Sequence, residues 1–102
     1  MTENREHFES IVNKIVDAEL GQMFGKPCGK MNNKVFVSFF DDEMVFKIGK
    51  EEVDSLLTKY KNSKNWDPSG KGRAMKDWIQ IPQEYKADWK KLATNALEFT
   101  SK

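Results

Sequence analysis

The sequence predicts an α+β fold: a two-layer sandwich in which a small antiparallel β-meander is flanked by an N-terminal, a middle and a C-terminal helix. Three observations predict it. Apolar residues recur with helical spacing near both ends of the chain, the spacing changes to strand-like alternation after Gly21, and short turn signals separate the central apolar runs. With 102 residues, the chain has the size of a single domain, 1–102, that can bury one core.

The N-terminal helix is expected from about Glu3 to about Glu19, with Gly21 as its stop signal. The segment Gly25–Met31 contains two glycines and a proline, so it is a poor helix and a candidate irregular edge strand. The helix is predicted because five apolar residues fall at i, i+3, i+4, i+7 and i+8, namely Phe8, Ile11, Val12, Ile15 and Val16.

The centre of the chain is expected to form a hairpin of two strands, Val35–Phe40 and Met44–Ile48. Both are rich in β-branched and aromatic residues, and a tight Asn32-Asn33 turn precedes the first strand. The turn Asp41–Glu43 between the strands is short, which implies antiparallel pairing.

The C-terminal half is expected to begin with a helix from about Lys50 to Lys61. Asn62–Arg73 is rich in Asn, Ser, Pro and Gly, which indicates a loop with Trp66 as its apolar anchor. A strand, Met75–Ile81, and an amphipathic helix from Tyr85 to about Phe99 complete the fold.

The charge and cysteine content exclude several classes of function. Seventeen basic residues oppose sixteen acidic ones, so the net charge of +1 provides no overall attraction to nucleic acid or to a membrane. The single cysteine, Cys28, cannot form an internal disulfide, which fits a reducing cytoplasm. The polar N-terminus has no apolar signal-peptide core, and no apolar run is long enough to span a membrane.

No catalytic or cofactor motif is evident. The segment Gly25-x-x-x-Gly29-Lys30 only superficially resembles a phosphate-binding loop, which needs four residues between the glycines and a Ser or Thr after the lysine. One histidine, His7, and one cysteine are too few for a zinc site. We therefore expect no enzyme activity, no small-molecule substrate, no metal and no organic cofactor.

Two groups of residues are candidates for binding. The segment Lys59–Lys76 is the most basic stretch, and its cations could follow phosphates while an aromatic ring stacks on a base. The alternative is a solvated loop whose tryptophan packs on the core. The candidate nucleic-acid contacts are Lys64, Trp66, Lys71, Arg73 and Lys76.

The second group lies on the strand Val35–Phe40, which is apolar on both faces. Strict alternation places Phe36 and Phe40 together, opposite Val35, Val37 and Phe39. If the helices cover one face only, these two phenylalanines form an apolar patch for a protein partner or a second copy of the chain. The alternative is that the helices cover both faces.

Several short motifs, in order, resemble the N-terminal domain of TfoX-type competence regulators (the TfoX/Sxy family) and the related MmcQ/YjbR-like proteins. They are Met23-Phe24-Gly25, Lys26-Pro27-Cys28-Gly29-Lys30, Lys34-Val35-Phe36, Met44–Ile48, Met75–Pro82, Asp88-Trp89 and Leu92–Leu97. The resemblance implies a small antiparallel sheet with flanking helices, a link to bacterial competence regulation and no catalytic residues.

The sequence therefore favours a non-enzymatic, cytoplasmic protein-interaction or regulatory module, with a protein partner or a homodimer. The alternative is a small nucleic-acid-binding module that uses the basic segment 59–76, with weak binding. The resemblance to YjbR-like proteins implies DNA as a ligand for that alternative.

Overall fold

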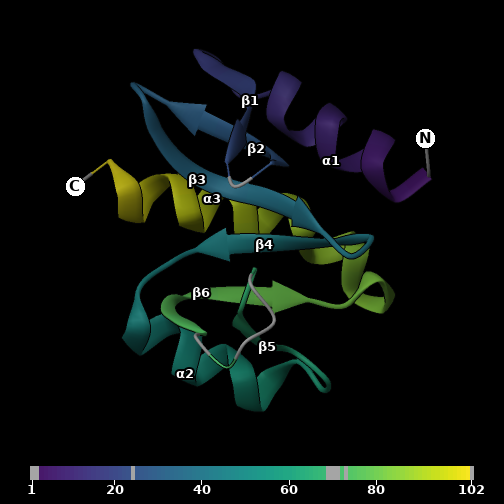
Figure 1. Ribbon diagram of the computed structural model, residues 1–102, viewed down its shortest axis with the longest axis vertical. Helices are drawn as coiled ribbons and strands as arrows, with labels where there is room; N and C mark the ends of the chain where they lie inside the picture. Colours follow the sequence, from purple (N-terminus) through teal and green to yellow (C-terminus); the bar gives the residue numbers. More distant parts are fainter. Residues whose placement is uncertain (1–2, 24, 69–71, 73, 102) are drawn as a thin grey trace.

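The computed structural model describes residues 3–23, 25–68, 72 and 74–101, and within them six strands form one antiparallel sheet in the order β1-β2-β3-β4-β6-β5 (Figure 1). The strands are β1 (Ala18–Met23), β2 (Lys26–Met31), β3 (Lys34–Phe40), β4 (Glu43–Lys47), β5 (Lys64–Trp66) and β6 (Met75–Ile81). The helices are α1 (Glu3–Asn13), α2 (Lys50–Lys59), the 3-10 helix η1 (Gln83–Asp88) and α3 (Trp89–Thr100). The predicted α+β sandwich is confirmed.

The main core lies between the sheet and the helices. Cross-strand partners share a face of a sheet, and the paired residues Val37, Phe46 and Ile79 all belong to this core. In Figure 1, α3 crosses behind β3 and β4. Buried apolar side chains of every α-helix join the same cluster, among them Phe8, Ile11, Val12, Val53, Leu56, Trp89, Leu92, Ala93 and Ala96.

The first helix is shorter than predicted, because the chain turns before Ala18. The helix α1 ends at Asn13, and Asp17 takes a left-handed conformation with φ of 69°. The following residues then form β1, which pairs along its whole length with β2. The prediction of β2 as an edge strand was therefore wrong, since β1 is the edge.

Gly29 explains how α1 packs so closely on β2. A Cβ atom at this position would lie 2.8 Å from Cγ2 of Val12 and 2.8 Å from Cγ2 of Val37, closer than real Cβ contacts. The missing side chain therefore leaves the space that the α1 side chain occupies.

A β-bulge overturns the predicted faces of β3. Gly29 pairs with Val37, but the next residue, Lys30, pairs with Val35, so Phe36 has no partner on β2. Phe36 consequently turns toward the helices and is fully buried in the main core. Phe40 lies on the opposite face, so the prediction that the two phenylalanines form one patch was wrong.

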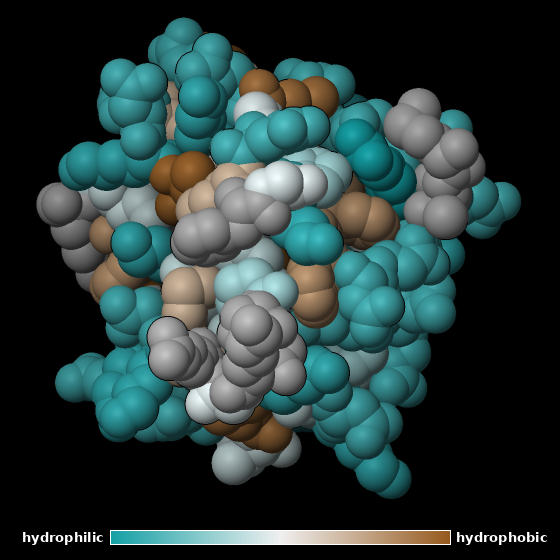
Figure 2. Space-filling view, viewed as in Figure 1, coloured by the Kyte–Doolittle hydropathy of each residue, from teal (hydrophilic) through white to brown (hydrophobic). Residues whose placement is uncertain are grey.

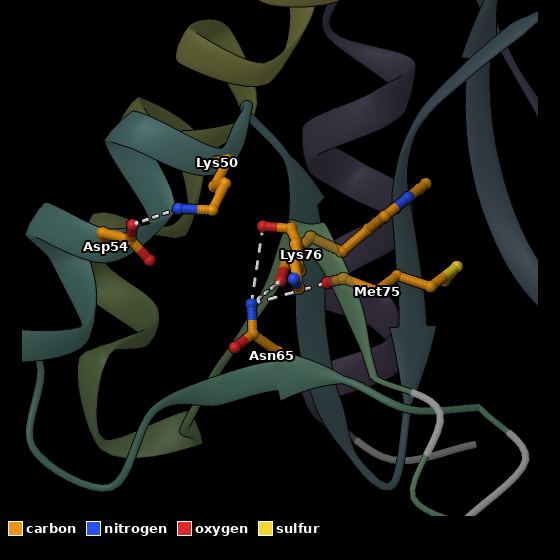
Figure 3. A network of polar contacts seen from close by, with 6 residues as sticks. Lys50, Asp54, Asn65, Met75 and Lys76 are labelled. Atoms are coloured by element: carbon orange, nitrogen blue, oxygen red, sulfur yellow. Dashed lines mark hydrogen bonds and ion pairs between the residues drawn. The ribbon is translucent and has the colours of Figure 1, made fainter.

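The segment predicted as a loop contains the short strand β5. The side-chain nitrogen of Asn65, Nδ2, lies 3.4, 3.5 and 3.3 Å from the carbonyl oxygens of Met75, Lys76 and Trp78, and so fastens β5 to β6 (Figure 3). The pairing shifts register directly after Asn65. Trp66 is fully buried, as its predicted role of apolar anchor requires.

Candidate functional site

The sheet face opposite the main core is the candidate site. Register pairing aligns Cys28, Ser38, Val45 and Gln80 across this face, with Lys64 at its edge. A second apolar cluster lies here, and within the described residues it contains strand residues and no helix residues. We call this surface the helix-free face. The cluster consists of Val45, Trp66 and Trp78, with Met23, Val35, Phe40 and Met75 packed against it.

Some of the buried residues on the helix-free face are polar, namely Ser38 and Gln80. Ser38 Oγ donates a hydrogen bond to the Pro27 carbonyl at 2.6 Å, and Gln80 Nε2 donates one to Glu43 Oε1 at 2.8 Å. Burial raises the pKa of the Cys28 thiol, while Lys30 and the Gly21 N–H act in the opposite direction. The protonated thiol is a poor nucleophile, so this cysteine fits a packing role.

The apolar centre of the face is only partly covered. Phe40 is half-buried and packs edge-on against Trp66, with ring centroids 6.0 Å apart. Trp66 in turn contacts Trp78, with centroids 4.9 Å apart. Val35 and Met75 are also half-buried. Figure 2, drawn from the same side as Figure 1, shows apolar surface between hydrophilic residues.

Lysines surround this centre. Register and alternation place five lysines of the described strands on the helix-free face, against the two carboxylates of Glu19 and Glu43. Lys76 is placed there by its two-residue spacing from Trp78, and the register shift between β5 and β6 brings its neighbour Met75 onto the same face. Lys30 Nζ lies 3.9 Å from Glu19 Oε1, and the Glu43 carboxylate accepts a hydrogen bond from Gln80. The face is therefore more positive than the whole chain. The lysines are Lys26, Lys30, Lys47, Lys64 and Lys76.

The predicted nucleic-acid contacts are only partly brought together. Lys64 and Lys76 are exposed on neighbouring strands of the helix-free face. Trp66 joins them but is fully buried, so its ring offers no open surface on which a base could stack. Lys71 and Arg73 lie outside the described residues.

Sequence reasoning missed Lys26, Lys30 and Lys47. Lys26 Nζ lies 5.2 Å from the centroid of the Phe40 ring, which places a cation at the edge of the apolar centre. These lysines are far from the segment 59–76 in the sequence, and only the strand order brings them onto one face. Alternation within each strand is the signal that could have found them.

A separate hollow of about 490 Å³ lies where α2 begins, beside α3. The charged residues of its lining are mostly acidic: Glu51, Glu52, Asp77 and Glu98, with Lys50 as the basic residue. Among the described residues, no three His, Cys, Asp or Glu side chains are grouped so that they could hold a metal ion. No helix in the described part of the chain is long and apolar enough to cross a membrane.

Comparisons with protein-family models, with curated proteins and with solved structures find no match for this chain. The helix-free face is therefore the main basis for a functional proposal.

Proposed function

We propose that this chain is a non-enzymatic regulatory module of the cytoplasm that binds another protein through its helix-free face. The observation that supports the proposal is the half-buried apolar centre around Phe40, ringed by lysines from several strands. Protein interfaces commonly have such an anatomy, with an apolar core and a polar rim. The regulatory role is supported separately, by the resemblance of the sequence motifs to the N-terminal domain of TfoX-type competence regulators.

The aromatic contacts favour a rigid binding surface. Trp66 packs against the Phe40 ring, Trp78 packs against Trp66, and Lys26 Nζ lies 5.2 Å from the centroid of the Phe40 ring. A side chain that is already held in place loses less conformational entropy on binding. The partner expected from this surface presents an apolar side chain to Phe40 and carboxylates to the surrounding lysines.

The test is affinity capture from an extract of the source cells, treated with nuclease. We expect the wild-type chain to retain a partner that Phe40→Ser loses. Phe99→Ser is the matched control, because Phe99 is also half-buried but lies on α3, beside the acidic hollow. A captured protein that Phe40→Ser retains as well as the wild-type chain does contradicts the proposal.

A second candidate function is the binding of single-stranded nucleic acid to the same face. The specific observation that favours it is the spread of lysines from β2 to β5, with Lys64 and Lys76 exposed. Lysines spaced across a sheet can follow a phosphate backbone without reading its sequence. Capture that disappears on nuclease treatment favours this candidate over the protein partner.

A further inference from the structure

The two edges of the sheet differ in how they are protected. The edge strand β5 has three residues, a register shift next to Trp66 and Pro68 shortly after its end. Such features prevent another chain from pairing with an edge. The other edge, β1, has six residues in unbroken register with β2, and it contains neither proline nor lysine. Figure 1 shows it at the outer border of the sheet.

The exposed large apolar side chains gather at the unprotected edge. Among the described residues, the exposed large apolar residues are Val16, which is 80% exposed, and Leu20, which is 40% exposed. Leu20 lies in the middle of β1, and Val16 lies two residues before the strand begins. Exposed apolar side chains beside a free strand edge are the usual hallmark of strand addition.

We propose that β1 pairs antiparallel with β1 of a second copy of this chain, across a two-fold axis perpendicular to the sheet. Such an axis keeps the helices of both copies on the same side of the joined sheet. Each β1 residue must therefore lie opposite a residue of the partner's β1 that points to the same face. Centred on Leu20, the pairing places it opposite the partner's Leu20 and places Glu19 opposite the partner's Gly21. No carboxylate then faces another carboxylate, and the exposed leucines cover each other.

The paired sheet would be continuous across both copies, with both helix-free faces on the same side. A six-residue strand is about 20 Å long, so strand pairing alone gives an interface below the standard size of about 800 Å² per partner. The dimer is therefore expected to be reversible and to depend on protein concentration.

Analytical ultracentrifugation between about 1 and 200 μM, a range that spans typical reversible affinities, tests the self-association. The expected mass rises from 11.9 kDa toward twice that value. Leu20→Lys should weaken dimerisation at least about tenfold, because two lysines would face each other at the axis. Thr58→Lys adds the same charge on an exposed position of α2 and should leave dimerisation unchanged. A monomer at every concentration, or a dimer indifferent to Leu20→Lys, overturns the proposal.

Disulfide formation tests the register and does not depend on the lysine variant. Opposite residues of antiparallel strands have Cα atoms about 4.5–5.5 Å apart, within disulfide range, so Leu20→Cys should cross-link two copies on mild oxidation. Gln22→Cys is the control, because the same axis separates its two copies by four residues along the strands, or about 13 Å. Cross-linking of neither variant, or preferentially of Gln22→Cys, overturns the pairing. Neither experiment involves a partner of the helix-free face, so the inference can fail independently of the proposed function.

Discussion

Phe40 and Trp66 contact each other edge to face, with ring centroids 6.0 Å apart and an interplanar angle of 64°. The contact joins β3 to β5, which are separated in the sheet by β4 and β6. It therefore spans the two intervening strands, whose residues Val45 and Trp78 belong to the same apolar cluster. Alternation along β3 places Phe40 on the same face as Ser38, and the contact with Trp66 packs its ring against β5.

Replacing Trp66 with alanine should destabilise the fold by about 3–5 kcal/mol, the usual range for removing a fully buried tryptophan. The cavity would remove the support for both Phe40 and Trp78. Urea unfolding monitored by far-UV circular dichroism measures the change. Leu20→Ala, at an exposed position, is the comparison and should change stability by less than about 0.5 kcal/mol if the chain is kept at monomeric concentration. A loss below about 1 kcal/mol for Trp66→Ala would mean that the second cluster does not stabilise the sheet.

Gly29→Ala should destabilise the chain by about 1–3 kcal/mol, because the added methyl group meets the side chains of Val12 and Val37 at 2.8 Å. Gly21→Ala is the matched control on the neighbouring strand. Its nearest contact is the flexible Lys30 side chain, whose Cε atom lies 3.2 Å away and can move. Thermal unfolding of both variants measures the difference. Equal effects would show that α1 does not pack on β2 as closely as described.

Stability should fall at alkaline pH. Burial raises the pKa of the Cys28 thiol above its usual value of 9.0, so the unfolded chain loses this proton first and is favoured as the pH rises through about 9.

A second group acts at higher pH. Burial, followed by the hydrogen bond and the charge of Asp88, raises the pKa of Tyr60 from 10.0. The Tyr60 hydroxyl donates to Asp88 Oδ2 at 3.0 Å. The stabilisation of the folded state by the protonated Tyr60 hydroxyl is therefore present below pH 10 and is lost as the pH rises above it.

Urea midpoints measured between pH 7 and pH 11, a range that covers both groups, test this expectation. Tyr60→Phe should flatten the decline above pH 10, and Cys28→Ala should flatten the part that begins near pH 9. A decline of unchanged shape in both variants would assign the alkaline sensitivity to other groups.

The elements that could be predicted from the sequence are those with a strong local pattern. The strand β3 was predicted to within one residue because β-branched and aromatic residues dominate it, and β6 was predicted with its observed bounds, Met75–Ile81, because its second half contains Trp78, Ile79 and Ile81 and Pro82 follows it. The strand β1 has neither feature in Ala18–Met23, and its pairing with β2 stabilises it. Local propensity could not predict that long-range pairing.

The residues of the candidate site were harder to predict from the sequence than the strands were. The side of β3 on which Phe36 lies depends on a bulge, which the sequence pattern does not mark. The lysines of the helix-free face come from β2, β4, β5 and β6, so the order of strands in the sheet decides that they share a surface. Lys64 and Lys76 were predicted to act together because they are close in sequence, and the structure places them on two strands, β5 and β6, that pair with each other.

The nucleic-acid candidate gives a prediction about salt. Each phosphate contact with a single strand adds about 0.7 to the slope of log affinity against log salt concentration. If Lys64 and Lys76 contact phosphates, the double variant Lys64→Ala/Lys76→Ala should reduce that slope by about 1.4. Fluorescence anisotropy of a labelled single-stranded oligonucleotide, recorded at several salt concentrations, measures the slope.

The matched control for this experiment is Lys90→Ala/Lys91→Ala, which removes two exposed lysines from α3, in the helix layer on the other side of the sheet. It removes the same total charge and should leave the slope unchanged if the helix-free face is the binding surface. Equal reductions in both double variants would indicate attraction to the chain as a whole. An unchanged slope in the Lys64→Ala/Lys76→Ala variant would exclude these two lysines from the contact and would leave the protein-binding proposal as the explanation of the face.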